Sequence, residues 1–412
     1  MTLFDGLDDL LPGTREFYTD LHAHPELSMQ EHRTAGLAAD RLAAAGFEVV
    51  TGVGPTGVVG VLRNGDGPTV ALRADMDALP VREASGVPYA STATATDDEG
   101  RATPVAHACG HDMHVAWLAA GAAQLAARRD AWSGTVVAVF QPGEEIGAGA
   151  QAMVDDGLVD RVPTPDVVLG QHVMPAPAGV VSTRPGTVTS ASDVWRIRLF
   201  GRGAHGSMPE ASIDPVVLAA STVLRLQTVV SRELGMNEPA VLTVGMLQAG
   251  SKENVIPDEA VIGLNLRCYD EGVRARAQAA IRRIVAAEAE ASGAPRPPEI
   301  TPVETYQLTD NDEAATGRVL DAFRSRFGDH VVPMGPTSAS EDFGVLGRAW
   351  GAPSVFWFVG GTDPEAHAAA ERDGRLTELP TNHSPAFAPV LDPTVRTGVE
   401  ALLTAAGAWL AP

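Results

Sequence analysis

Three short segments in the first half of the chain are continuously apolar and rich in β-branched residues, and they restrict the fold more than any other feature. They are TVALR (69–73), TVVAVF (135–140) and DVVLG (166–170). Unbroken apolar runs of this length are typical of parallel strands that are covered on both faces. Residues 112–129 lie between the first two runs and have the spacing of a helix. The order strand, helix, strand predicts an open α/β sheet with right-handed crossovers.

Two further segments are expected to belong to the same domain. Ser28 and Glu31 form a capping-box pattern ahead of residues 32–46, whose Ala and Leu spacing and final glycine predict a capped helix. Late in the chain, APSVFWFVGG (352–361) predicts another buried strand. The first domain is therefore expected to resume after an interruption.

The pattern changes from about residue 187 and predicts the order β-α-β-β-α-β, which is typical of a small two-layer domain. The predicted elements are DVWRIRLFGRG, DPVVLAASTVLRLQTVVSRE, AVLTVGMLQAG, EAVIGLNLRCYD, GVRARAQAAIRRIVAAEAEA and PEITPVETY. RPGT (184–187) and GAPRPP (293–298) are plausible hinges around it. We therefore predict a second domain at residues 187–302, inserted into a first domain made of residues 1–186 and 303–412.

The charge of the chain argues against several classes of partner. Asp and Glu total 52 against 30 Lys and Arg, which gives a net charge of −22. Such a charge repels nucleic-acid phosphates and anionic lipids, so we expect neither as a partner. Residues 1–20 are acidic and lack the basic stretch and apolar run of an export signal. With only two cysteines, we predict a cytoplasmic protein without disulfides.

Side chains that can bind metals follow each of the three apolar runs. They are Asp75, Asp77, Glu144, Glu145 and His172. The carboxyl ends of parallel strands share one edge of a sheet, and α/β proteins bind their ligands there. The segment ACGHDMH (108–114) leads into the first predicted crossover helix, so we expect Cys109 and His111 at the same edge.

Each of these residues alone has an ordinary structural explanation. A lone carboxylate often caps a helix, a lone cysteine is more often a small buried apolar residue, and a lone histidine is more often a hydrogen-bonded core residue. As a set they combine thiolate, imidazole and carboxylate groups, which zinc and neighbouring transition metals prefer. The predicted ligands are Cys109, His111, Glu145, His172 and His383 in TNHSPAF.

The adjacent pair Glu144 and Glu145 predicts one metal ligand and one general base, because a metal-activated water needs a nearby carboxylate to accept its proton. The alternative is a thiol nucleophile at Cys109 with a neighbouring histidine as its base. We disfavour that alternative because one intervening glycine does not easily align the two groups, and a metal would occupy the thiolate.

These segments together resemble the signature blocks of the N-acyl amino-acid amidohydrolases. This family includes hippurate hydrolase and plant auxin-conjugate hydrolases, and it is related to carboxypeptidase G and succinyl-diaminopimelate desuccinylase. The matching segments are DLHAHPELS, ALRADMDALPV, HACGHDMH, QPGEEIGAGAQAMVDDGL, GQHV, GRGAHGSMPEASIDP, NVIPDEA and SEDFG. The resemblance implies a zinc-peptidase-like, three-layer α/β catalytic domain with an inserted ferredoxin-like α+β domain that serves as a lid and dimerises.

The resemblance also implies two divalent metal ions, Zn or Mn with Co or Ni as alternatives, held by the five ligands named above. It implies that Glu144 is the general base, that Asp77 orients a ligand histidine and that Cys109 bridges the metals. The implied activity is metal-dependent hydrolysis of N-acyl amino acids, hippurate-like or N-acetylated, to a carboxylic acid and a free amino acid.

In the inserted domain, the resemblance implies that His205 steadies the oxyanion and that Asn254 and Arg267 bind the substrate carboxylate. Glu210 and Asn382 depart from the family pattern, which leaves the preferred substrate open. Three other functions remain: a dipeptidase of the same fold, a biosynthetic deacylase, and a catalytically silent relative that binds an acylated ligand.

Overall fold

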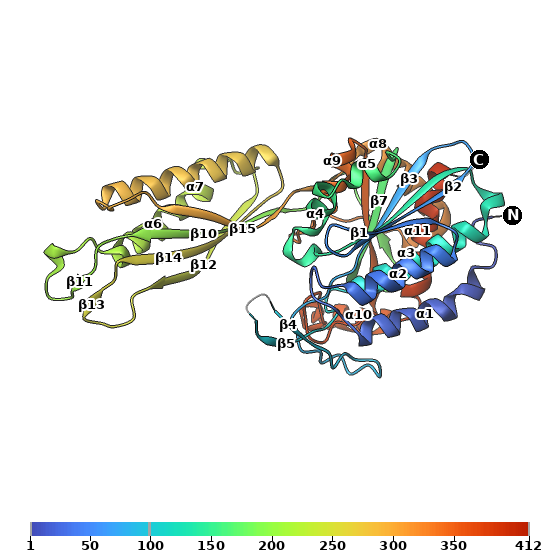
Figure 1. The fold of residues 1–412 in the computed structure, drawn as a ribbon, viewed down its shortest axis with the longest axis horizontal. Coiled ribbons are helices and arrows are strands. Elements are labelled where there is room, and N and C mark those ends of the chain that lie inside the picture. The colour runs from blue at the N-terminus through green and yellow to red at the C-terminus, as the bar shows by residue number, and fades with distance from the viewer. Residues whose placement is uncertain (1, 98–99, 411–412) are drawn as a thin grey trace. The chain divides into compact units, whose positions relative to one another are not determined.

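The computed structural model describes residues 2–97 and 100–410, and the chain divides into two compact units (Figure 1). The first unit comprises the residues up to Val188, Asp310–Gly335 and the residues from Asp342 onward. The second unit comprises Thr189–Thr309 and Pro336–Glu341. The second unit is therefore an insertion in the chain of the first.

The first unit is built on a seven-stranded sheet with the strand order β1-β2-β6-β3-β7-β17-β8. Its strands are β1 (Glu48–Val53), β2 (Gly57–Asn64), β3 (Thr69–Asp75), β6 (Gly134–Gln141), β7 (Val167–Pro177), β8 (Val181–Ser182) and β17 (Ser354–Thr362). The four central strands β6, β3, β7 and β17 are parallel, and β1, β2 and β8 pair antiparallel at the edges. The three apolar runs are β3, β6 and β7, as predicted, and β17 is the fourth buried strand.

Helices cover both faces of this sheet. They are α1 (Leu7–Ala23), α2 (His32–Ala44), α3 (His111–Ala127), α4 (Gly149–Asp155), α5 (Leu158–Arg161), α8 (Glu313–Phe327), α9 (Gly344–Trp350), α10 (Pro364–Arg372) and α11 (Thr394–Leu410). Successive side chains of one strand enter different cores: Val70 and Leu72 of β3 pack with α1, α2, α3, α8 and α11, whereas Ala71 packs with α4, α5 and α9. Because both faces are buried, the sequences of these strands do not alternate between apolar and polar residues. The sheet with a layer of helices on each face forms a three-layer α/β unit.

The expected capping box at the start of α2 is wrong. The Ser28 hydroxyl donates to Asp77 Oδ2 at 2.7 Å, so it does not cap the helix. The Glu31 carboxylate accepts the backbone N–H groups of Met29 and Gly143, both at 2.9 Å. These residues join α2 to the ends of β3 and β6, and they lie against the candidate site.

The second unit has a four-stranded antiparallel sheet with the order β12-β14-β10-β15 and a core shared with two helices. Its elements are β10 (Ala191–Phe200), β11 (Ala204–His205), α6 (Pro215–Thr228), β12 (Ala240–Ala249), β13 (Val255–Ile256), β14 (Glu259–Cys268), α7 (Glu271–Ala291) and β15 (Glu299–Tyr306). The Pro-rich segment 293–298 joins α7 to β15 inside this unit. Since β15 pairs with β10, the chain leaves the unit after Thr309 and not at the expected residue 302.

Short strands complete the description: β4 (Thr94–Thr96) pairs with β5 (Ala102–Pro104), and β9 (Gly186–Thr189) pairs with β16 (Thr309–Asn311). Across the described part of the chain, none of the helices combines the length and apolarity that a membrane span requires.

Candidate metal centre

The carboxyl ends of the central strands place the candidate residues. Asp77 follows β3, and Glu144 and Glu145 stand in a 3-10 turn directly after β6. His172 lies inside β7 and not in a loop after it, because β7 continues to Pro177. His111 is the first residue of α3. Segments far apart in the sequence thus meet at one edge of the sheet, as predicted.

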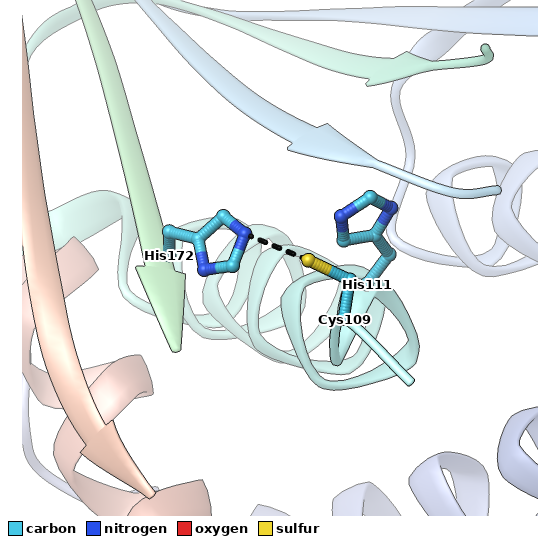
Figure 2. Close-up of side chains that lie close together, drawn as sticks. All are labelled: Cys109, His111 and His172. Carbon is cyan, nitrogen blue, oxygen red and sulfur yellow. Dashed lines mark hydrogen bonds between the residues drawn. The ribbon is translucent and has the colours of Figure 1, made fainter. Parts of the chain in front are cut away.

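Gly110 allows the chain to bring Cys109 close to β7. Its φ of 86° is left-handed, and a Cβ at this position would lie 2.4 Å from Val173 Cγ1. A side chain at Gly110 would therefore separate α3 from β7. Figure 2 shows the result: Cys109 Sγ lies 3.5 Å from His172 Nε2, with the His111 ring beside them. The candidate ligand atoms of these three residues all lie within 4.8 Å of one another.

A second group shares the same thiol. Cys109, Glu145 and His383 also place their ligand atoms within 4.8 Å of one another, and His383 Nε2 lies 3.3 Å from Glu145 Oε2. The His383 backbone has a φ of 69° and its N–H donates to Ala108 O at 2.8 Å. The loop that carries His383 is therefore fixed to the loop that carries Cys109, and the thiol stands between two groups of three ligands.

Asp77 orients His111. Its Oδ1 atom accepts a hydrogen bond from His111 Nδ1 at 3.1 Å, while Oδ2 accepts the Glu145 backbone N–H at 2.9 Å and the Ser28 hydroxyl. Nδ1 is therefore engaged, and Nε2 is the nitrogen of His111 that could bind a metal once its proton is displaced. Among the described residues, neither His111 Nε2 nor Glu145 Oε1 has a hydrogen-bond partner, although both atoms are buried. Buried polar atoms without partners are costly, and a bound cation would satisfy both.

The pKa values of the candidate ligands are ones that a bound cation would shift. Burial opposes a charge on His111, but the carboxylates of Asp75 and Asp77 nevertheless raise its pKa to about 10. Burial raises the pKa of Glu145 to about 8 and the pKa of the Cys109 thiol well above its ordinary value. The metal-free site therefore retains protons on groups that could bind metal, and a divalent cation would displace them. The residues present fit a metal centre.

His172 is already in the form that binds metal. Burial, and then the neighbouring His114, lower its pKa well below the ordinary value, so the ring is neutral. Its Nδ1 donates to the Val173 carbonyl at 2.7 Å. The proton is therefore on Nδ1, and the Nε2 lone pair faces Cys109.

Comparisons with known proteins agree with this geometry. The model of peptidase family M20/M25/M40 matches residues 71–378. The chain belongs to this family. Relatives of this M20/M25/M40 protein include thermostable carboxypeptidase 2 of Saccharolobus solfataricus, with 38% identity over 82% of this chain and 84% of the relative. Hippurate hydrolase of Campylobacter jejuni has 35% identity over 84% of this chain and 88% of its own.

The solved structures include a Bacillus subtilis protein described as a dinuclear metal-binding peptidase of the M20 family. It superimposes with a TM-score of 0.76 and 27% identity, covering 97% of this chain and 98% of its own. The family and these relatives show that the chain is a metal-dependent hydrolase of the amidohydrolase type.

His205, predicted to steady the oxyanion, and the two predicted substrate-binding residues belong to the second unit of the M20/M25/M40 chain and not to this cluster. His205 is exposed on β11, where its Nδ1 lies 2.7 Å from the Ser207 hydroxyl. Asn254 is adjacent, because its carbonyl accepts the Gly206 N–H at 2.8 Å. Arg267 stands at the other end of β14, where Nη1 donates to Ser338 O at 2.7 Å and to the Ser340 hydroxyl at 3.0 Å. Their roles stay predictions.

Several residues at the metal centre were not predicted from the sequence. Asn382 Nδ2 donates to the carbonyls of Cys109, at 3.1 Å, and Val173, at 3.2 Å, so this departure from the family pattern joins two ligand-bearing segments. The spacing of Ser28 and Glu31 predicts a helix cap and gives no sign of their hydrogen bonds beside the site. The only sequence feature that points to His114 is its position in the same short motif as Cys109 and His111.

Proposed function

We propose that this protein hydrolyses the amide bond of N-acyl amino acids, hippurate-like or N-acetylated, with two divalent metal ions. The observation that carries the proposal is the pair of ligand groups that share the Cys109 thiol, beside a further buried carboxylate at Glu144. The names hippurate hydrolase and carboxypeptidase, carried by two relatives, both denote cleavage of an amide whose nitrogen belongs to an amino acid with a free carboxylate.

In this proposal Cys109, His111 and His172 hold one metal, and Cys109, Glu145 and His383 hold the other. The mixture of sulfur, nitrogen and oxygen donors suits Zn or Mn, with Co or Ni as alternatives. When bound, the metals polarise the substrate carbonyl and lower the pKa of water. Asp77 keeps the His111 ring in the orientation that presents Nε2.

Glu144 moves the proton. Its Oε2 lies 3.9 Å from His111 Nε2 and the residue is buried, so the carboxylate faces the ligand atoms. We assign it to accept the proton of the attacking water and then to donate that proton to the leaving amine. The carbonyl carbon forms a bond to the water oxygen and breaks its bond to nitrogen, which releases a carboxylic acid and a free amino acid.

The second unit supplies substrate contacts in this proposal. The His205 imidazole steadies the oxyanion that develops at the carbonyl. Arg267 binds the α-carboxylate of the amino acid, for which a guanidinium has a suitable geometry. Asn254 lies at the opposite end of the unit, beside His205, and would contact the same carboxylate from a second copy of the chain. The hydrogen bonds of Arg267 to Ser338 and Ser340 hold the guanidinium in one orientation.

We also propose that two copies of the chain pair through β12 of the second unit. Both β12 and β15 are edge strands, but β15 carries Pro302 and two glutamates, which block pairing, whereas β12 has no charged residue. Val241 and Leu247 of β12 are 57% and 50% exposed, and Leu224 of α6 is 74% exposed. An unprotected edge with exposed apolar side chains suits an antiparallel strand of a second copy. The cytoplasmic location stays a prediction.

The test of the proposed function is amine release from N-benzoylglycine, a panel of N-acetyl amino acids and a panel of dipeptides. Purified protein is assayed after chelation and again after addition of Zn, Mn or Co. We expect activity to be lost on chelation, restored by metal and highest with N-acyl amino acids. Preference for dipeptides would establish the dipeptidase alternative. Activity that survives chelation but not alkylation would establish a thiol nucleophile, and inactivity with every metal and substrate would contradict the proposal.

A further inference from the structure

We propose that His114 is a positioning residue that holds His172 in place through the backbone of Val173. His114 is 1% exposed and lies on α3. Its Nδ1 lies 2.5 Å from Asp75 Oδ1, and its Nε2 accepts the Val173 N–H at 2.8 Å. The two ring nitrogens therefore connect the end of β3 to the ligand-bearing part of β7.

These contacts define the tautomer of His114. A backbone N–H can only donate, so Nε2 must carry a lone pair, and the single proton of the neutral ring is on Nδ1. The Asp75 carboxylate accepts the hydrogen bond from this Nδ1–H group. Asp75, His111 and His114 lie close enough together to hold a metal. However, both nitrogens of His114 are already engaged in hydrogen bonds, so the ring has no lone pair to offer. His114 is thus a support of the metal centre and not a ligand.

Asp75 is itself fixed by a buried cation. Arg73 Nη1 donates to Asp75 Oδ2 at 2.8 Å, Arg73 Nε donates to Gln141 Oε1 at 2.9 Å, and Arg73 Nη2 donates to Asp342 Oδ1 at 3.1 Å. The Asp342 carboxylate also accepts the Ala150 N–H at 2.9 Å. All four of the side chains in this network are buried. Arg73 bonds to Asp75 within β3, whereas its bonds to Gln141 and Asp342 cross to β6 and to the SEDFG segment, so Arg73 ties Asp75 to both.

The Val173 backbone connects His114 to His172. Its N–H is bonded to His114, and its carbonyl accepts from His172 Nδ1 at 2.7 Å and from Asn382 at 3.2 Å. The His114 and His172 rings also contact each other, with centroids 4.5 Å apart at 67°. Hydrogen bonds to the outer nitrogen of a ligand histidine set its orientation. His114 therefore determines where the His172 Nε2 lone pair points.

The inference rests on the proposed function only in taking His172 as a metal ligand, and its test uses no substrate. His114→Phe keeps a ring for packing but removes both hydrogen bonds, whereas His114→Gln keeps one donor and one acceptor. We expect His114→Phe to weaken the binding of one of the two metals by about 10–100-fold, with two metals still bound at saturation, and His114→Gln to recover part of the loss. The measurements are competition with a chromophoric chelator and metal analysis at saturation.

Two results would overturn the inference: unchanged metal affinity in His114→Phe, or the loss of one metal at saturation in both variants, which would make His114 a ligand. If His114→Phe does not fold, imidazole ¹⁵N NMR of the metal-free wild type tests the proposal by showing which nitrogen of His114 carries the proton. His114→Gln identifies the signal of this residue. We expect a neutral ring protonated on Nδ1, and protonation on Nε2 would contradict the proposal. Neither measurement depends on whether any amide is hydrolysed.

Discussion

At the scale of single residues, Glu144 and Glu145 are adjacent but occupy different surroundings. Glu145 shares a ligand group with Cys109 and His383, whereas Glu144 does not belong to either of the two groups that share the thiol. We expect Glu144→Gln to keep both metals and the fold but to lower kcat by about 100- to 10,000-fold, because the base is lost. Glu145→Gln should instead lower metal content. Metal analysis and kcat for both variants check this, and near-normal turnover in Glu144→Gln would remove the base assignment.

Ser28 supports Asp77, which in turn orients His111. Ser28→Ala removes one hydrogen bond to a buried carboxylate, and Asp77 keeps its bonds to His111 and to the Glu145 backbone. We expect a loss of about 1 kcal/mol in the free energy of unfolding together with weaker metal binding. The check is urea denaturation with and without metal, with Ser28→Thr as the control that retains the hydroxyl. Equal metal affinity in all three proteins would show that Ser28 has no such role.

At the scale of elements, His22 of α1 joins two segments that flank the site. Its Nδ1 lies 2.6 Å from Asp112 on α3 and its Nε2 lies 2.9 Å from Glu83. Although burial opposes the charge, the carboxylate of Asp112 and then that of Glu83 raise the pKa of His22 to about 10. Because the folded pKa exceeds the ordinary value of about 6.5, the stabilisation is complete below about pH 6.5 and is lost as the pH rises toward about 10.

The measurement is the urea midpoint of metal-free protein between pH 6.5 and 10, for the wild type and for His22→Gln. We expect the wild type to be more stable at pH 6.5 and the difference to shrink toward pH 10. His24→Gln, which replaces an exposed histidine just after α1, is the control for the loss of a histidine outside this buried network. A difference between wild type and His22→Gln that stays constant or grows with pH would contradict the assignment of charge to His22.

The elements that could be predicted from sequence are those whose burial is uniform or strictly periodic. β3, β6 and β17 were recognisable because both of their faces are covered, and α7 because its apolar residues share one face. The Ser28–Glu31 pattern misled the prediction because a capping box and a pair of long-range hydrogen bonds require the same polar residues. Nothing in the local sequence indicates that Asp77, 49 positions away, accepts the Ser28 hydroxyl.

At the scale of the whole molecule, the clustering of the candidate ligands could be predicted because parallel strands bring their carboxyl ends to one edge. The residues that support these candidate ligands could not be predicted. Asn382, for example, donates to the backbone carbonyls of Cys109 and Val173, and a backbone carbonyl leaves no signal in the sequence because every residue has one. His205, Asn254 and Arg267 came from the family resemblance alone. They have no pattern of spacing that connects them to the first unit.

The proposed pairing of two copies gives a prediction at this scale. Val241→Lys and Leu247→Lys together place two charges on the exposed side of β12, where they oppose strand pairing. We expect the wild type to be a dimer and this variant a monomer, measured by light scattering after gel filtration. Val303→Lys on β15, which is 49% exposed in the wild type, is the matched control and should remain a dimer. A wild-type monomer, or a dimer that survives the β12 substitutions, would contradict the proposed interface.

The position of β17 between β7 and β8 has a consequence for synthesis on the ribosome. Residues 354–362 must be translated before the central sheet can close, and His383 emerges later still. The sheet of the second unit needs only residues 191–306. We therefore expect the inserted unit to fold first on the nascent chain. The apolar strands β3, β6 and β7 remain without β17, the strand that completes their sheet, until it has been translated. During that interval the future metal-binding half is the part of the chain that needs chaperones.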